Sequence, residues 1–305
     1  MNNINNRYPH VLDKVKKILE LSDEERIYFL REEKWINYPL ASDILDKMDT
    51  LIKYPRKSRM PNMLLVGETN NGKTSIINRF LQKNPPIRNH ENVETTKIPV
   101  TAIQAPLNAN LSDFYSSILK QFAVPYRNTD KTAKKQQQIE HYFNLCGLKI
   151  LIIDEIHNIL GAPIARQTMF MNALKTMSND LKISIVLAGI KDALHATNTN
   201  NQISNRFKPV FLTKWQLSRD YLSLLASIEM TLPLRQRSNI AQNKEIAHKI
   251  LDLSEGYIGE MLDLLISASE YAINNKIEKV TIECIKKSGF VKPSLRKNFE
   301  DMVQL

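Results

Sequence analysis

The feature that most constrains this chain is a short loop framed by two glycines, GETNNGKT at residues 67–74. It fits the pattern GxxxxGK[ST]. An apolar run at residues 63–66 precedes the loop, and a helical pattern over residues 73–82 follows it. In such a segment the backbone N–H groups turn inward around phosphate groups, and the helix N-terminus adds positive potential. The loop therefore predicts a nucleotide-binding site within an α/β domain.

The residues of this loop have backbone and side-chain roles. Glycine is scarce, with 8 in the whole chain, so two glycines within six positions indicate a backbone requirement. We expect Lys73 to reach the β- and γ-phosphates and Thr74 to hold Mg²⁺. The predicted nucleotide-binding residues are Gly67, Glu68, Thr69, Asn70, Asn71, Gly72, Lys73, Thr74 and Ser75.

A second segment, which ends in two carboxylates, points to the same chemistry. Residues 150–155 read ILIIDE, an apolar strand followed by Asp154 and Glu155. Ligands of parallel sheets bind beyond the carboxyl ends of the strands, so both carboxylates are expected to face the phosphates. Asp154 fits the Mg²⁺ ligand of P-loop ATPases. Glu155 is placed to polarise a water for attack on the γ-phosphate. His157 follows closely, either as a relay to the next helix or as a structural histidine.

Short apolar runs alternate with longer amphipathic stretches through the middle of the chain, which predicts a doubly wound parallel sheet. Four runs read as buried strands, at residues 63–66, 98–103, 149–153 and 183–188, and a fifth, weaker run follows at 210–212. The expected helices of this part span residues 73–82, 111–122, 133–146 and 167–179.

Helical patterns without strands flank this core. The first sixty residues predict three helices, the second of them with a capping box at Ser22 and Glu25. After residue 218, four helices are expected at 221–230, 244–253, 259–275 and 281–288. We therefore divide the chain into an N-terminal helical extension (1–58), a phosphate-binding α/β core (59–217) and a small all-helical C-terminal domain with a basic tail (218–305).

Composition narrows the class of protein. The chain has 305 residues, 43% of them hydrophobic and 24% charged, which excludes a disordered chain. Its net charge of +10 favours a polyanionic partner. Cys146 and Cys284 have no CxxC spacing, which argues against a disulfide framework and a cysteine zinc site. No apolar run approaches the ~18 residues of a membrane span, and the polar start has no signal-peptide core. We expect a soluble cytoplasmic protein with no membrane partner.

Arg206 is the candidate for a residue that completes the nucleotide site. It lies in NRF at 205–207, before the fifth apolar run. In multimeric P-loop ATPases an arginine at this place enters the neighbouring subunit's site and contributes ~10³–10⁵ in rate. The alternative is a surface arginine in a local ion pair. No polar side chain follows the fourth run at residues 188–190, and no arginine occurs between residues 239 and 294. Nucleotide sensing is therefore expected to be reduced or achieved differently.

Together these residues resemble AAA+ ATPases, and more narrowly the TniB/TnsC group of transposition regulators. The narrower resemblance covers about residues 35–275 and rests most on RMPN and LPLR. Its segments are WINYP (35–39), RMPN (59–62), GETNNGKT (67–74), DEIHN (154–158), NRF (205–207), LPLR (232–235) and GYIGE (256–260). The resemblance implies a P-loop AAA+ core that uses ATP and Mg²⁺, with residues 218–305 as its lid and with Lys73, Glu155 and Arg206 serving catalysis.

The same resemblance implies a homo-oligomer on duplex DNA, as a ring or a helical filament. It also implies a link between target-site selection and a DDE-type transposase, with a target-selection protein as a further partner and slow ATP hydrolysis as a switch. Three other functions stay open at this point. One is a helicase-loader-type ATPase of replication. The second is a nucleotide-kinase-like enzyme, which the acidic pair and Arg206 disfavour, and the third is an ATP-binding scaffold without turnover, which Glu155 disfavours.

Three basic clusters are candidates for contact with DNA phosphates, which would be salt-sensitive and largely independent of sequence. The first is favoured because the resemblance places the region between the second and third strands at the central channel. It consists of Arg127, Lys131, Lys134 and Lys135. The second cluster is Lys53, Arg56, Lys57 and Arg59, and the third is Lys286, Lys287, Lys292, Arg296 and Lys297. The alternative for each cluster is a solvated face.

Overall fold

The computed structural model describes residues 7–88, 96–194 and 205–296. The chain divides into two compact units, which we call the sheet unit (Leu40–Thr213) and the helical unit (Met1–Pro39 with Lys214–Leu305). This division differs from the three predicted segments 1–58, 59–217 and 218–305. The first helices belong with the C-terminal helices, whereas the third helix belongs almost entirely to the sheet unit.

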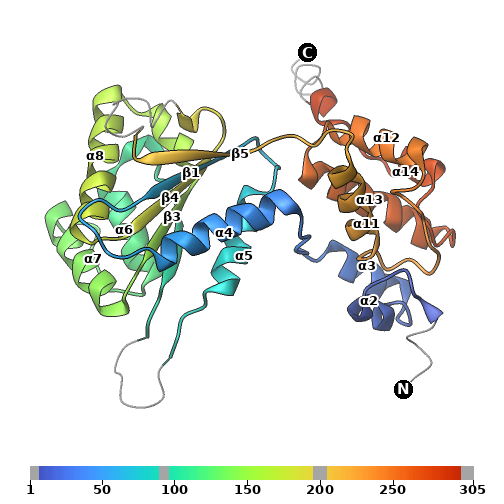
Figure 1. Ribbon diagram of the computed structural model, residues 1–305, viewed down its shortest axis with the longest axis horizontal. Helices are drawn as coiled ribbons and strands as arrows, with labels where there is room; N and C mark the ends of the chain where they lie inside the picture. Colours follow the sequence, from blue (N-terminus) through green and yellow to red (C-terminus); the bar gives the residue numbers. More distant parts are fainter. Residues whose placement is uncertain (1–6, 89–95, 195–204, 297–305) are drawn as a thin grey trace. The chain divides into compact units, whose positions relative to one another are not determined.

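The sheet unit is built on five strands in the order β2-β3-β4-β1-β5 (Figure 1). They are β1 (Asn62–Gly67), β2 (Val100–Gln104), β3 (Ile150–Asp154), β4 (Ser184–Gly189) and β5 (Phe207–Leu212). Neighbouring strands in this order pair in parallel. β1, β3 and β4 are buried along their whole length, because helices cover both faces of the sheet. The predicted α/β class with a doubly wound parallel sheet is confirmed.

β5 is longer than the apolar run that sequence analysis identified at residues 210–212. It pairs with β1 over six residues, from Phe207 beside Asn62 to Leu212 beside Gly67. β5 lies at the edge of the sheet, and its Lys208 and Pro209 are exposed. An edge strand tolerates proline and needs no continuous apolar run, which is why its first half carries no strand pattern.

Helices cover the two faces of this sheet (Figure 1). α4 and α5 lie on one face, where Nζ of Lys83 is 2.9 Å from Oδ2 of Asp49. α6, α7 and α8 cover the other face. The bounds are α4 (Pro39–Lys53), α5 (Lys73–Lys83), α6 (Leu111–Gln121), α7 (Thr132–Cys146) and α8 (Ile164–Asp180), with short 3-10 turns η1 (Leu107–Ala109) and η2 (Ile156–Gly161).

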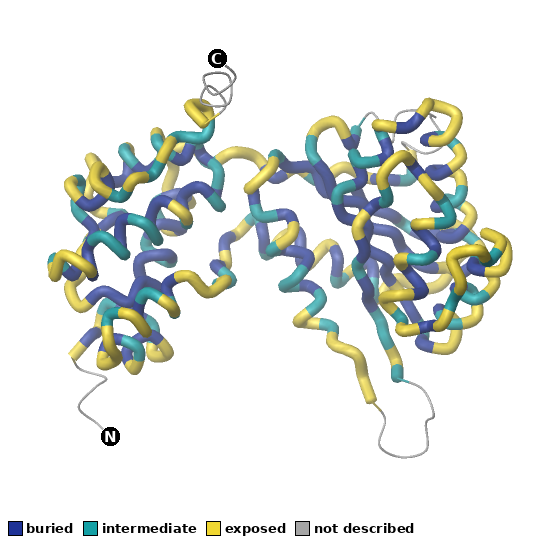
Figure 2. Tube along the Cα trace, turned by 180° about the vertical axis from the view of Figure 1, so that it is seen from behind, coloured by how far each residue is buried: buried dark blue, intermediate teal, exposed yellow. Residues whose placement is uncertain are grey.

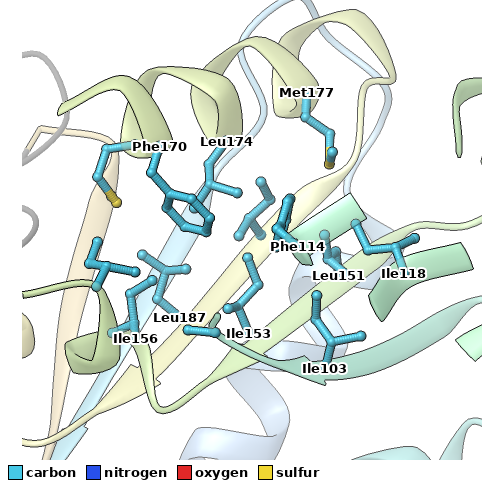
Figure 3. Close-up of a cluster of buried hydrophobic side chains, with 14 of the residues drawn as sticks. Ile103, Phe114, Ile118, Leu151, Ile153, Ile156, Phe170, Leu174, Met177 and Leu187 are labelled. Atoms are coloured by element: carbon cyan, nitrogen blue, oxygen red, sulfur yellow. The ribbon is translucent and has the colours of Figure 1, made fainter. Parts of the chain in front are cut away.

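A hydrophobic core fills the space between the strands and α6, α7 and α8. Figure 3 shows Phe170 and Leu174 of α8 directed towards Ile153 and Leu187 of the sheet. Phe114 of α6 packs edge-on against Phe170, with the ring centroids 5.0 Å apart. All five side chains are fully buried. Close packing of this kind holds β3 and β4 in place, and with them the strand ends from which polar residues project.

The helical unit joins the two ends of the chain. Its helices are α2 (Asp13–Ile18), α3 (Asp23–Arg31), α11 (Arg219–Glu229), α12 (Lys244–Ser254), α13 (Ile258–Asn274) and α14 (Ile282–Lys287). The predicted capping box at the start of α3 is present, with Ser22 and Glu25 bonded to each other's backbone N–H. Arg26 of α3 is fully buried and donates to the carbonyl of Pro233 and to the carboxylate of Glu278. The segment LPLR therefore anchors the N-terminal helices.

Each unit has an interior of its own. Figure 2 shows buried residues along the strands of the sheet unit and along the inner faces of the helices in both units. In the described part of the chain, no helix combines the length and the apolar character that crossing a membrane requires.

Candidate nucleotide-binding site

The phosphate loop joins the end of β1 to the start of α5. A Cβ on Gly67 would lie 2.9 Å from the Cβ of Leu212, so the end of β5 leaves room for glycine and for no larger residue. Gly72 has φ of 86°, a left-handed conformation that glycine adopts without steric cost. Both glycines therefore meet backbone requirements, which explains their presence in a chain with few glycines.

Lys73 begins α5 with its side chain turned back into the loop. Its Nζ donates to the carbonyl of Gly67 at 2.9 Å and to that of Glu68 at 3.0 Å, and the residue is buried. Burial lowers the pKa of Lys73, while the carboxylates of Glu155, Asp154 and Glu68 act in the opposite direction. The ammonium group is thus held inside the loop by carbonyl oxygens that phosphate oxygens can replace.

Thr74 and Asp154, the two predicted Mg²⁺ ligands, lie together. The Thr74 hydroxyl donates to Oδ2 of Asp154 at 2.9 Å, and Oδ1 of Asp154 accepts from the Glu155 N–H at 2.8 Å. Among the described residues no group of three or more His, Cys, Asp or Glu side chains could bind a metal. Mg²⁺ characteristically takes one or two protein oxygens and completes its shell with phosphates and water. A hydroxyl paired with one carboxylate fits that ion.

The remaining loop residues surround Lys73 in different ways. Asn71 is buried, and its Nδ2 donates to the carbonyls of Leu212 at 2.9 Å and Thr213 at 3.3 Å, which ties the loop to the end of β5. Thr69 and Asn70 are exposed at the turn, and Ser75 is half-buried in the first turn of α5. The loop side chains thus divide between holding the loop and facing outward.

Glu155 follows β3 in an unusual backbone conformation. Its φ of 56° and ψ of 39° place it in the left-handed region, which non-glycine residues seldom adopt. Residues in such conformations cluster at functional sites. Its Oε2 lies 3.1 Å from Nε2 of His157, and its negative charge acts to raise the pKa of Lys73. The structure therefore brings Lys73, Thr74, Asp154 and Glu155 to one end of the sheet.

Arg206 lies at the other end of the sheet from these residues. It comes directly before Phe207, the first residue of β5, which pairs with the first residue of β1. At ~3.3 Å per residue, the length of β1 puts roughly 20 Å between the start of the strands and the phosphate loop. The guanidinium donates to Oδ1 of Asn179 at 2.7 Å. Burial and the charge of Arg59 lower the pKa of Arg206. Arg206 is therefore out of reach of the phosphate loop of its own chain.

The first basic cluster is split by the structure. Arg127 and Lys131, which lie between α6 and α7, and Lys134 in the first turn of α7 are exposed. Lys134 Nζ lies 2.8 Å from Oδ1 of Asp130, and the hydrogen bond from Lys134 is the first cause that lowers the pKa of this aspartate. Lys135 is 1% exposed, so its placement among the DNA-facing residues needs correction.

Lys135 has internal partners in place of a solvent shell. Its Nζ donates to the hydroxyls of Ser112 at 2.9 Å and Ser116 at 3.0 Å and lies 5.6 Å from the ring centroid of Tyr126. A buried ammonium needs such partners, and these come from a helix about twenty residues upstream. The side chain ties α6 to α7.

The other two basic clusters differ in their surroundings. Lys53, Arg56, Lys57 and Arg59 are exposed before β1. In the C-terminal cluster, carboxylates already face most of the cations. The pairs are Lys287 with Glu283 at 2.8 Å, Lys292 with Asp252 at 3.0 Å and Arg296 with Glu260 at 2.7 Å. Lys297 lies outside the described residues. The C-terminal cluster is therefore the least suited of the three to bind phosphates.

Sequence analysis did not select Lys191 as a site residue. Lys191 lies two residues after Gly189, the last residue of β4, and its Nζ is 3.3 Å from Oε1 of Glu68 in the phosphate loop. The available signal was its place just beyond a buried strand, at the edge where ligands of parallel sheets bind. Lys191 lies one residue beyond the segment 188–190, which has no polar side chain.

Comparison with protein families and curated proteins gave two matches. The family model described as "TniB: Bacterial TniB protein" matches residues 26–217. The GTPase Der of Karelsulcia muelleri (strain GWSS) is 23% identical over 225 residues, which cover 70% of this chain and 49% of Der. The chain thus spans about half the length of this curated relative.

Solved structures with a similar fold include two proteins of archaeal origin. Cdc6p from Pyrobaculum aerophilum has a TM-score of 0.60 and 14% identity, and covers 88% of this chain and 70% of its own. The Aeropyrum pernix ORC1 protein, solved in complex with DNA, has a TM-score of 0.57 and 13% identity, with 86% of this chain and 68% of that chain covered. At these identities the likeness concerns the fold alone.

Proposed function

The chain belongs to the TniB family, as an AAA+ ATPase, and we propose that it regulates DNA transposition as an ATP-dependent oligomer on duplex DNA. The observation that carries this proposal is the placement of the site residues. Lys73, Thr74, Asp154 and Glu155 meet at the end of the sheet where the strands finish, while Arg206 lies at the opposite end, where the strands begin. A site of this kind is completed by a neighbouring subunit.

Several residues of the chain have separate roles in ATP hydrolysis. Backbone N–H groups of the loop and Lys73 hold the β- and γ-phosphates. Thr74 and Asp154 would hold Mg²⁺, which neutralises phosphate charge when bound. Glu155 accepts a proton from the water that attacks the γ-phosphate, so ADP and inorganic phosphate are released. Arg206 of the next subunit stabilises the charge on the transferred phosphoryl group.

The proposed DNA contact uses the exposed part of the first basic cluster, Arg127, Lys131 and Lys134. Cations that neutralise phosphates release counterions, so binding is salt-dependent and largely independent of sequence. ATP binding orders the oligomer on DNA, and the oligomer recruits or activates a DDE-type transposase with the help of a target-selection protein. Hydrolysis then releases the assembly and acts as a switch.

The test is fluorescence anisotropy of a labelled duplex with the Glu155→Gln variant, which keeps the ATP-bound state. We expect tight, length-dependent and salt-dependent binding in ATP and weak binding in ADP. A matched Lys73→Ala variant, which cannot hold the phosphates, should bind weakly in both nucleotides. Equal binding of Glu155→Gln in ATP and ADP would contradict nucleotide gating.

The alternative function is helicase loading in replication, because the same AAA+ core serves helicase loaders. The two functions differ in the protein that responds to the ATP-bound oligomer. Stimulation of strand transfer by a transposase supports the transposition proposal. Loading of a replicative helicase onto DNA, with no effect on strand transfer, supports the alternative.

A further inference from the structure

His157 lies between the acidic pair and the end of β4. It is the second residue of η2, directly after the strand that carries Asp154. Its Nε2 lies 3.1 Å from Oε2 of Glu155. Its Nδ1 is buried and has no hydrogen-bond partner among the residues that the structure describes. One ring nitrogen therefore faces the carboxylate, and the other faces the interior.

The interior side of this ring meets Gly189. A Cβ on Gly189 would lie 2.9 Å from the Cβ of Ala193, 3.0 Å from Cγ2 of Ile156 and 3.3 Å from Nδ1 of His157. Gly189 ends β4 and pairs with Val66, the residue before the phosphate loop. This is the place where a polar residue could sense the γ-phosphate and where the chain has none. The imidazole, together with Ala193 and Ile156, thus fills the space beside residue 189.

The surroundings of the two nitrogens indicate the tautomer of the ring. A protonated Nδ1 would be a buried donor without an acceptor, which is unfavourable. A neutral ring with hydrogen on Nε2 leaves Nδ1 as an unprotonated nitrogen and directs an N–H at Glu155. The geometry therefore corresponds to the Nε2–H tautomer, donating to the carboxylate.

This contact fixes a side chain that would otherwise rotate. Glu155 has three side-chain torsions, and its carboxylate must face the loop to act as a base. Its charge acts to raise the pKa of Lys73, whose ammonium group lies inside the loop. His157 contacts the carboxylate within 3.1 Å while its ring packs beside β4. The base is therefore supported by a ring that the sheet itself holds.

We propose that His157 is a positioning residue that orients Glu155 and takes the place of the polar residue missing at the end of β4. The inference rests on the proposed ATP hydrolysis with Glu155 as the base. Removal of the ring should slow the chemical step and leave nucleotide binding unchanged, because the loop contacts of Lys73 do not involve His157.

The kinetic test compares His157→Leu with His157→Gln in steady-state phosphate release. Leucine fills the space without a donor, so we expect kcat to fall about tenfold or more with ATP affinity unchanged. Glutamine carries an amide N–H of similar reach and should retain most of the activity. Equal losses in the two variants, or full activity in His157→Leu, would overturn the inference.

A second measurement is independent of turnover. The chain has 6 histidines, so ¹⁵N-labelled rings can be followed by NMR and the His157 signals identified by their loss in His157→Gln. We expect the Nε2–H tautomer in the wild type and a shift of the His157 signals in Glu155→Gln. Unmoved signals would overturn the contact. Absence of ATP turnover in the wild type would overturn the proposed function and the positioning role together, whereas a wild type that hydrolyses ATP beside a fully active His157→Leu overturns only the role of His157.

Discussion

The hydroxyl of Thr74 lies 2.9 Å from Oδ2 of Asp154, 80 residues further along the chain. Thr74 follows β1 and Asp154 ends β3, and these strands are not neighbours, because β4 lies between them. The contact therefore depends on the order of the strands and on the common direction in which they run. It brings together two oxygen ligands of the kind that Mg²⁺ prefers.

Replacement of Thr74 tests this pair. Thr74→Val keeps the shape of the side chain and removes the hydroxyl, whereas Thr74→Ser keeps the hydroxyl. We expect Thr74→Val to lower ATP turnover about tenfold or more and to require a higher Mg²⁺ concentration, because one metal ligand is lost. Thr74→Ser should stay near wild type. Phosphate release measured over a range of Mg²⁺ concentrations distinguishes them, and the same Mg²⁺ dependence in both variants would contradict the assignment.

The exposed cations between α6 and α7 are expected to determine the salt dependence of DNA binding. Neutralising Arg127 and Lys131 together as glutamines should weaken binding and reduce the slope of log K against log salt by about two. Lys279→Gln removes an exposed charge from the helical unit and provides the control. Anisotropy at several salt concentrations measures the slope. An unchanged slope would exclude this cluster as a phosphate contact.

Lys135 should behave differently from its exposed neighbours. Lys135→Met leaves the hydroxyls of Ser112 and Ser116 without their buried partner, and we expect a loss of about 1–3 kcal/mol of unfolding free energy. The salt slope of DNA binding should not change. Denaturant unfolding and anisotropy on the same variant measure both effects, and a changed salt slope at full stability would place Lys135 on the DNA.

The parts of the fold that sequence predicts are those with local patterns. The phosphate loop combines fixed spacing with an apolar strand before it and a helix after it, and β3 ends in an acidic pair. Each of these signals spans only a few neighbouring residues, so it can be recognised without knowledge of the fold. The capping box at Ser22 and Glu25 is local in the same sense.

The parts that sequence misses depend on distant partners. Lys135 reads as one more cation in a basic run, because its acceptors lie on α6. The first half of β5 has no apolar strand pattern, because Lys208 and Pro209 of this edge strand are exposed. Arg26 and Glu278 are 252 residues apart, so no window of sequence indicates that the first helices join the last ones.

The pairing of Arg26 with Glu278 should be a major source of stability in the helical unit. Arg26 is fully buried and donates through Nη1 to Oε1 of Glu278 at 2.9 Å. Glu278→Gln removes the buried carboxylate that pairs with Arg26 and leaves the guanidinium only the partly exposed Asp23, at 3.1 Å, as a counter-ion, which should cost about 3–5 kcal/mol. The more exposed pair of Arg31 and Glu270 provides the control, because Glu270→Gln should cost under about 1 kcal/mol. Equal costs in urea unfolding would contradict this difference.

The same pair predicts an acid limb in the stability profile. Burial acts to raise the pKa of Glu278, but the hydrogen bonds and charges of Arg26 and Arg235 outweigh it and hold the pKa below its ordinary value of 4.5. A carboxyl with a depressed folded pKa stabilises the fold above its unfolded pKa. That contribution is lost as the pH falls from about 4.5 through the lower folded value. The free energy of unfolding, measured between pH 6 and 3, should fall less steeply with decreasing pH in Glu278→Gln than in wild type.

Arg206 provides a test of whether two subunits share one site. Arg206→Ala should bind ATP normally, because the residue lies at the opposite end of the strands from its own phosphate loop. Its turnover should fall roughly 10³-fold, because the arginine that serves the neighbouring site is lost. Lys73→Ala should not bind ATP but still presents Arg206 to a neighbour. Mixing the two variants should therefore give more turnover than the two variants measured separately. Arg206→Ala mixed with Arg206→Ala,Lys73→Ala is the matched control, since no subunit then supplies the arginine. No rescue in mixtures shown by cross-linking to form joint oligomers would mean that Arg206 acts within its own subunit or not at all.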